Sequence, residues 1–292
     1  MRIFPALLAL SLLVVSEFSP SPAMAQTLDL GRGEVPLNVP AEIDTANPAP
    51  LVVLLHGYGS SGAGQEDYMK FGELVDRYGF ILINPDGTRE SGGDNNRFWN
   101  ASTACCNFMQ SQVDDTAYVI SLIDEVKSRF NVDDRRVYLI GHSNGGFMSY
   151  RIAYEHPDTI AAIASLAGAA STESLPAPTR SVHVLQIHGT SDTTISYEGS
   201  DINGNNYPGA IETVERWAAY NGCAVQGDTT AMLDLERNLD GMETTVVRYD
   251  DGCRTGGSSE LWTIAGGSHV PAISDSFSEQ IIEWLLARSG ER

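Results

Sequence analysis

The sequence has few basic residues and none of the patterns that bind nucleotides or transition metals. Its 292 residues include 18 Lys and Arg against 38 Asp and Glu, which gives a net charge of −20 at pH 7. Nucleic acid and anionic membranes repel such a surface, so neither is expected as a partner. No His and Cys cluster suits a transition metal, and no Gly-rich loop suits a phosphate. We therefore expect no cofactor and no metal, and the charge is compatible with a neutral substrate.

Long hydrophobic runs are also missing, and the one short run lies near the start. Arg2 is followed by an apolar run from Leu7 to Val15 and by the small-residue pattern Ala23-Met24-Ala25. This is the pattern of a secretory signal peptide at residues 1–25, and the run is too short to span a bilayer. An uncleaved membrane anchor is the alternative. The sequence predicts a soluble secreted protein, extracellular or periplasmic, whose catalytic domain is residues 26–292.

Cysteine is scarce, with only four residues. In an exported chain four cysteines favour disulfides, and they allow three pairings. Cys223 and Cys253 flank a polar stretch and could close a loop, and such a bridge is worth about 3–4 kcal/mol in the chain-entropy model. If they pair, the adjacent Cys105 and Cys106 are left with each other, either as a vicinal bridge or as two thiols.

Apolar strands and amphipathic helices alternate along the chain, without an internal repeat, a low-complexity linker or a second domain. This alternation predicts a mostly parallel central sheet with helices on both faces, in a single α/β domain that we expect to be a monomer. Strands are expected at residues 51–55, 80–84, 136–140, 161–166, 182–187 and 260–264. Helices are expected at residues 66–78, 115–130, 145–154 and 274–287, with Asp114 as the cap of the second.

The segment GHSNGG at residues 141–146 is the main candidate for chemistry. It lies between a predicted strand and a predicted helix, which is the context that a G-x-S-x-G nucleophile elbow requires. Gly141 and Gly145 avoid clashes around a serine on a sharp turn, and Gly146 lets the helix pack close to the sheet. An ordinary glycine-rich turn, the alternative, would need neither the strand nor the helix. We therefore predict that Ser143 is a nucleophile.

A serine hydroxyl needs a base, and in this fold the chain order is Ser, then acid, then His. Of the six histidines, only His269 follows a plausible acid with room to spare, in a loop before the last helix. Asp192 follows the strand that ends at His188, where an acid would orient the imidazole and stabilise its cation. The other aspartates lie in polar stretches or turns and are expected to be solvated: Asp201, Asp228, Asp234, Asp240, Asp250 and Asp251.

The tetrahedral oxyanion of acyl transfer needs two preorganised N–H donors. One is expected from the backbone of Asn144, and the other from Tyr58 in the loop after the first buried strand. His56 is expected to brace that loop. Trp99 is a candidate for the lining of the substrate pocket, with core packing as the alternative.

A weaker signal concerns a cation. Residues Asp201 to Glu212 partly match a calcium loop, but the sixth place is Asn206 rather than Gly, and no helix precedes the stretch. A polar surface loop is the better interpretation.

Several ordered motifs resemble one family. They are LVVLLHGYGSSG at 51–62, RFWNASTACC at 97–106, QVDD at 112–115, GHSNGG at 141–146, HGTSD at 188–192, WAAYNGC at 217–223 and GGSHVP at 266–271. These resemble the polyhydroxybutyrate depolymerase-like esterases, exported α/β-hydrolases that include feruloyl esterases, over nearly all of the mature chain. The resemblance implies an α/β-hydrolase fold, a triad of Ser143, Asp192 and His269, and a Cys223–Cys253 disulfide.

The sequence therefore predicts a serine carboxylic-ester hydrolase that acts through an acyl-enzyme on a small-molecule, oligomeric or polymeric ester. GGSHVP departs from GGGHTWP, which is common in the family, and the chain has no linker or surface-binding domain. These departures favour soluble or oligomeric esters, including feruloylated or acetylated sugars, over insoluble polyester. The alternatives are a serine peptidase of related fold and a non-catalytic binding protein on a hydrolase scaffold. Loops at 90–107 and 196–210 are expected to shape the pocket.

Overall fold

The computed structural model describes residues 26–291 except 44, 45, 174 and 225, so the predicted signal peptide at 1–25 lies outside the described residues. The main sheet consists of β1 (Gln26–Asp29), β2 (Glu34–Asn38), β3 (Ala49–Leu55), β4 (Ile81–Ile83), β7 (Val132–His142), β8 (Ala162–Leu166), β9 (His183–Gly189), β12 (Asp228–Leu233), β13 (Thr244–Tyr249) and β14 (Ser258–Ile264). Two short hairpins lie outside it: β5 (Thr88–Arg89) with β6 (Arg97–Phe98), and β10 (Gly199–Ile202) with β11 (Asn205–Pro208).

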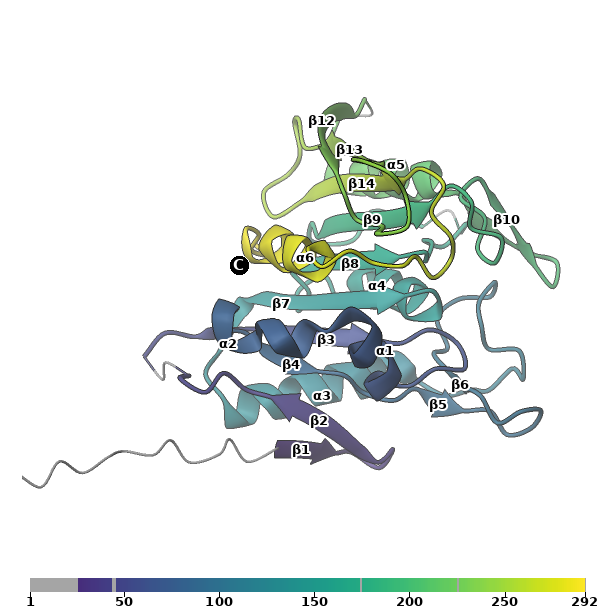
Figure 1. The fold of residues 1–292 in the computed structure, drawn as a ribbon. Coiled ribbons are helices and arrows are strands. Elements are labelled where there is room, and N and C mark those ends of the chain that lie inside the picture. Colours follow the sequence, from purple (N-terminus) through teal and green to yellow (C-terminus); the bar gives the residue numbers. More distant parts are fainter. Residues whose placement is uncertain (1–25, 44–45, 174, 225, 292) are drawn as a thin grey trace, which may run out of the picture.

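The sheet is parallel in its middle and antiparallel at both edges. The strand order is β1-β2-β4-β3-β7-β8-β9-β14-β13-β12 (Figure 1). All pairs from β4 to β14 are parallel, whereas β1, β2, β13 and β12 join the edges antiparallel. The prediction of a mostly parallel sheet is therefore confirmed.

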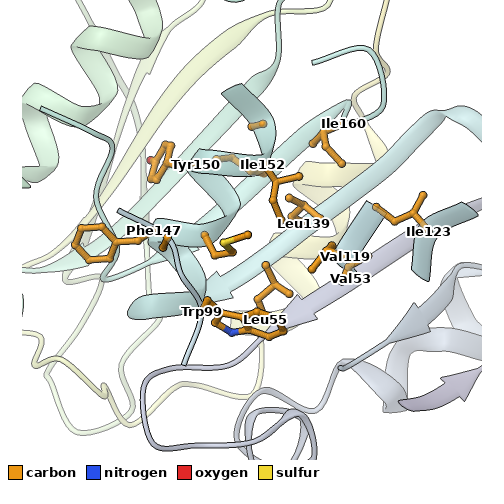
Figure 2. Packing of buried hydrophobic residues seen from close by; sticks show 14 of the residues in the cluster. Val53, Leu55, Trp99, Val119, Ile123, Leu139, Phe147, Tyr150, Ile152 and Ile160 are labelled. Atoms are coloured by element: carbon orange, nitrogen blue, oxygen red, sulfur yellow. The ribbon is translucent and has the colours of Figure 1, made fainter. Parts of the chain in front are cut away.

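Helices cover both faces of this sheet. One layer contains α1 (Gly62–Met69), α2 (Val75–Tyr78) and α6 (Phe277–Leu286), and the other contains α3 (Asp115–Arg129), α4 (Asn144–Glu155) and α5 (Ala210–Asn221) (Figure 1). The side chains of strand β3 pack alternately against the two helical layers. Leu51, Val53 and Leu55 pack beneath α3 and α4 (Figure 2), whereas Val52 and Leu54 pack toward the other layer. Because successive side chains of a strand point to opposite faces, a continuous apolar run is what a two-sided sheet requires.

The prediction of one continuous helix at 66–78 is wrong. Helix α1 ends at Met69, because Lys70 adopts a left-handed conformation with φ of 57°. A 3₁₀ turn at Phe71–Leu74 and the short α2 follow. The Glu66 carboxylate accepts a hydrogen bond from the Gly72 N–H at 2.6 Å, which fixes this bend. The bend buries Phe71 completely, so core packing prevails over helix continuation.

The sequence analysis also missed the edge strands, both hairpins and α5. Nearly every residue of β12 is exposed, so the strand carries no alternating apolar pattern. Helix α5 begins after Gly209, which offers no side-chain cap. These elements therefore lack the local signals on which sequence interpretation depends.

Both disulfides form. Cys223, just after α5, joins Cys253 in the segment before β14, and Cys105 joins Cys106. The predicted Cys223–Cys253 pairing is confirmed, and of the two outcomes considered for the adjacent cysteines the structure has the bridge. Within the described part of the chain, no helix is long and apolar enough to cross a membrane.

Candidate active site

Ser143 lies on a sharp turn between β7 and α4. Its backbone has φ of 54° and ψ of −119°, a region that residues with a side chain rarely adopt. The flanking glycines show why the spacing is needed. A Cβ at Gly141 would lie 2.1 Å from the Gly145 carbonyl oxygen, and a Cβ at Gly145 would lie 2.2 Å from the Leu55 carbonyl oxygen. Only glycine fits at either position, so the turn has the geometry of a nucleophile elbow.

The structure brings Ser143, His269 and Asp192 into one hydrogen-bonded line. The Ser143 hydroxyl is 3.0 Å from His269 Nε2, and His269 Nδ1 donates to Asp192 Oδ2 at 2.7 Å. The other carboxylate oxygen, Oδ1, accepts from the backbone N–H groups of Thr194 (2.8 Å) and Ile195 (2.9 Å). The serine is thus within reach of a base that a carboxylate orients.

Neighbouring strands supply the predicted acid and base. Asp192 follows β9, and His269 follows β14, which pairs with β9 in parallel. The two loops also contact each other, because the Ser191 N–H donates to the Gly267 carbonyl at 2.9 Å. Ser143 follows β7, which is separated from β9 by β8. Asp192 and His269 therefore lie on two loops that are bonded to each other and follow adjacent strands, whereas Ser143 follows a strand that is not adjacent to either.

Asp192 is held as a carboxylate. Burial by itself raises the pKa of this group, but hydrogen bonds from His188 and His269 outweigh burial and lower the pKa well below its usual range. His188 Nε2 lies 3.3 Å from Asp192 Oδ2 and also donates to the Ile195 carbonyl at 2.9 Å. The Asp192 carboxylate therefore stays ionised around neutral pH and can accept the hydrogen bond from His269 Nδ1.

A buried pair behind Asp192 was not recognised in the sequence. Gln186 Nε2 donates to the Gly168 carbonyl at 2.7 Å and to His188 Nδ1 at 3.1 Å, so the N–H of His188 is left on Nε2, facing Asp192. Gln186 Oε1 in turn accepts from the Tyr150 hydroxyl at 2.8 Å. Two polar residues at alternate positions of an otherwise apolar strand are the signal that would have revealed this pair.

His142 was also given no role in the sequence analysis. Its Nε2 donates to the His269 carbonyl at 3.0 Å, and the two rings lie 5.2 Å apart. Burial lowers the pKa of His142 to about 4, so this histidine stays neutral near pH 7. The Tyr68 hydroxyl donates to the Pro271 carbonyl at 2.7 Å and holds the same loop from the other side of His269.

The two predicted oxyanion donors flank Ser143. Asn144 is the first residue of α4, and the first N–H groups of a helix have no acceptor within that helix. Tyr58 follows Gly57, and a Cβ on Gly57 would lie 3.4 Å from the Cβ of Ser143. His56 braces this loop as expected, since its Nδ1 donates to the Gly57 carbonyl at 2.7 Å.

Trp99 corrects the pocket prediction. Its side chain is completely buried, and its Nε1 donates to the His56 carbonyl at 3.0 Å. The Asn144 side chain bonds the Trp99 backbone twice: it accepts from the N–H at 2.7 Å and donates to the carbonyl at 2.9 Å. Trp99 therefore packs in the core and ties the loop before α3 to the elbow, so the assignment to the pocket lining is not supported.

The stretch that partly matches a calcium loop has another arrangement. Asp201 lies in the β10–β11 hairpin, where its Oδ1 accepts from the Gly204 N–H at 2.8 Å. Glu212 lies in α5 and pairs with Arg216 at 3.0 Å. Among the described residues, no group of three or more His, Cys, Asp or Glu side chains is placed to hold a metal ion.

A family model described as phospholipase/carboxylesterase matches residues 41–237, which include Ser143 and Asp192. The chain belongs to the phospholipase/carboxylesterase family. This membership confirms the predicted α/β-hydrolase fold, and the relatives described next support the predicted resemblance to feruloyl esterases. The resemblance to polyhydroxybutyrate depolymerases stays a prediction.

Relatives of this phospholipase/carboxylesterase family member are named as esterases. Feruloyl esterase B of Piromyces equi is 27% identical over 231 residues, which are 76% of this chain and 40% of that protein. The bifunctional acetylxylan esterase/xylanase XynS20E of Neocallimastix patriciarum is 29% identical over 166 residues, which are 56% of this chain and 22% of that protein. The chain thus spans less than half the length of either relative. The acetyl xylan esterase from Aspergillus awamori shares the fold, with a TM-score of 0.59 at 18% identity over 89% of this chain and 98% of that one.

Proposed function

We propose that the protein is an exported carboxylic-ester hydrolase that uses Ser143 as nucleophile, His269 as base and Asp192 as orienting acid. The observation that carries the proposal is the hydrogen-bonded line from the Ser143 hydroxyl through His269 to Asp192. Membership of the phospholipase/carboxylesterase family supports the reaction class. The two disulfides and the signal-peptide pattern at residues 1–25 support export to an oxidising compartment.

The proposed reaction proceeds through an acyl-enzyme. Ser143 Oγ attacks the ester carbonyl carbon while His269 Nε2 takes the hydroxyl proton, and the backbone N–H groups of Tyr58 and Asn144 bind the oxyanion. The intermediate collapses, the carbon–oxygen bond to the alcohol breaks, and His269 gives its proton to the leaving oxygen. Water then attacks the acyl-Ser143 with His269 again as base. The carboxylic acid leaves, and the serine hydroxyl is restored.

The substrates that fit best are esters attached to plant polysaccharide. The names of two relatives refer to feruloyl and acetylxylan esters. Both ester types are uncharged at the reacting group, which suits a protein with a net charge of −20. The choice between them is tested by offering methyl ferulate, acetylated xylan and polyhydroxybutyrate side by side. Release of 3-hydroxybutyrate alone would contradict the assignment.

Replacement of the nucleophile tests the catalytic proposal. Ser143→Ala is expected to lower kcat for 4-nitrophenyl acetate by at least about 10³-fold, because the acyl-enzyme can no longer form. The thermal midpoint should change little, because alanine keeps the Cβ and the backbone conformation and only the hydroxyl is removed. Ser149→Ala is the matched control, since Ser149 is a nearby buried serine, within α4, whose hydroxyl donates to the Gly145 carbonyl.

Covalent labelling identifies the reacting atom. A fluorophosphonate should label the wild type and the Ser149→Ala variant but not Ser143→Ala. Full esterase activity in Ser143→Ala would refute the proposal, and preferential cleavage of peptide p-nitroanilides would indicate a peptidase instead.

A further inference from the structure

A hollow of about 690 Å³ lies over the outer sides of α4 and α5, beside the candidate active site. Ser143, Asp192 and His269 are not among the residues that line it. Its near end is formed by Phe147, whose N–H donates to the Ser143 carbonyl at 3.0 Å. Both loops that were expected to shape a pocket, 90–107 and 196–210, contribute to its wall.

Beside the hollow, one crossover of the sheet has no helix among its described residues. The connections from β7 to β8 and from β9 to β14 contain α4 and α5. Between β8 and β9, the described residues of the segment 167–182 form only irregular chain. This irregular segment contributes Ala169, Ala170, Ser171 and Leu175 to the wall of the hollow.

Two half-buried aromatic rings line the hollow, Tyr154 of α4 and Tyr220 of α5. Three buried rings lie beneath them: Phe147 and Tyr150 of α4, which Figure 2 shows among the packed side chains of the core, and Trp217 of α5. Ring centres lie 5.9 Å apart for Tyr150 and Trp217, 5.7 Å for Trp217 and Tyr220, and 6.1 Å for Tyr154 and Tyr220. From Phe147 to Tyr154 the helix rises by about 10 Å.

The rim carries mostly neutral hydrogen-bonding side chains, with Glu173 as an exposed carboxylate. Four exposed side chains contribute hydroxyl or amide groups: Thr103, Gln110, Gln112 and Asn205. Hydroxyl and amide groups can each donate and accept, so they suit a ligand that does both.

The two arginines that line the hollow both form ion pairs with glutamates. Arg151 pairs with Glu155 at 2.9 Å and donates to the Asn100 carbonyl at 2.6 Å, and Arg216 pairs with Glu212 at 3.0 Å. The hollow is thus nearly neutral on a strongly acidic protein, and it offers no spare cation for a phosphate or carboxylate.

We propose that this hollow binds a neutral oligosaccharide chain. A sugar ring presents an apolar C–H face that packs on aromatic rings, and its hydroxyls bond to amides and hydroxyls at the rim. A purely apolar ligand would leave the amides and hydroxyls of the rim without ligand partners, and an anion would find no free cation. The site goes beyond the proposed hydrolysis, because it holds the polysaccharide whether or not an ester is cleaved. It would retain a chain that starts one helical turn from Ser143.

Calorimetric titration with xylohexaose, which contains no ester, tests binding without catalysis. Tyr154→Ala should weaken binding by at least about tenfold, because it removes the most accessible ring of α4. Tyr154→Phe should bind like the wild type, since the ring remains. Tyr78→Ala is the matched control, because Tyr78 is a similarly half-buried tyrosine on the opposite helical layer. Hydrolysis of 4-nitrophenyl acetate should be unchanged in all three variants.

Cellohexaose and ethyl ferulate separate the possible ligands. Binding of either hexaose that is lost in Tyr154→Ala supports the proposal. Absence of binding for both sugars at millimolar concentration, or binding that Tyr154→Ala leaves unchanged, overturns it. Ethyl ferulate binding that depends on Tyr154 while neither sugar binds also overturns it, because the hollow would then be an acyl pocket.

If Tyr154→Ala fails to fold, Tyr220→Ala takes its place. A failed Ser143→Ala test leaves these outcomes unaffected.

Discussion

Asp192 keeps its charge in a buried position because N–H groups from three sides point at it. Two come from its own loop, through Thr194 and Ile195, one from His269 and one from His188. Each charge-assisted hydrogen bond is stronger than a neutral one, so together they outweigh the cost of burial. His188 is thus a positioning residue that acts through Asp192.

Removal of that donor should change the pH profile. In His188→Phe, Asp192 loses one hydrogen bond, so its pKa rises and kcat/KM falls by about 10- to 100-fold. The proposed mechanism needs His269 neutral and the Asp192 carboxylate ionised, so activity falls with pH as either group is protonated. A raised Asp192 pKa should make the loss of kcat/KM at the acidic end of the profile begin at higher pH, which is measured with 4-nitrophenyl acetate.

Two variants control this experiment. His183→Phe changes a histidine at the other end of β9, which contacts Ser258 rather than Asp192, and should leave the acidic limb in place. His188→Gln keeps a side-chain N–H and should restore part of the activity. A His188→Phe variant that keeps both the wild-type kcat/KM and the wild-type pH profile would show that His188 does not act through Asp192.

The elements that carry the site were predictable in part. Ser143, Asp192 and His269 each follow a strongly apolar strand, so their order and setting were evident in the sequence. Trp99 was harder to place, because a large aromatic residue beside a polar loop has the same local pattern in a core as in a pocket. Gln186 was missed because its partner, Tyr150, lies 36 residues away in another element, and such distant contacts leave little local signal. His188 lies only four residues before Asp192, and its alternation with Gln186 in an apolar strand was a local signal that was not used.

The packing of α4 against β3 gives a test at the scale of the element. Gly145→Ala would place a Cβ 2.2 Å from the Leu55 carbonyl oxygen, so either the helix or the strand must shift. We expect a loss of about 1–3 kcal/mol in the free energy of unfolding and a large loss of activity, because the elbow moves with the helix. Urea unfolding measures the first and 4-nitrophenyl acetate hydrolysis the second.

Gly92→Ala is the matched control for this substitution. A Cβ at Gly92 meets no atom within 4 Å, so the free energy of unfolding should change by less than about 0.5 kcal/mol. Equal effects of the two substitutions would mean that the close approach at Gly145 does not determine the position of α4.

At the scale of the whole molecule, the two disulfides should differ in how much they contribute to the free energy of unfolding. Cys223 and Cys253 are 30 residues apart, so their bond restricts a long loop of the unfolded chain, whereas Cys105 and Cys106 enclose no loop. Replacement of the first pair by alanine should lower the free energy of unfolding by about 3–4 kcal/mol in the chain-entropy model. Urea unfolding of this variant and of the Cys105→Ala/Cys106→Ala variant compares the two. A smaller loss for the 223–253 pair would contradict the entropic account.

The shared support of Asp192 and His269 has a consequence for how the molecule moves. Both groups follow the adjacent strands β9 and β14, and their loops are bonded to each other, whereas Ser143 follows β7 on the far side of β8. We expect the distance between Asp192 and His269 to vary less in thermal motion than the distance between His269 and Ser143, because the two bonded loops move together. In the proposed mechanism the second distance is also the one that changes, because the hydrogen bond from Ser143 to His269 is lost while the serine oxygen carries the acyl group.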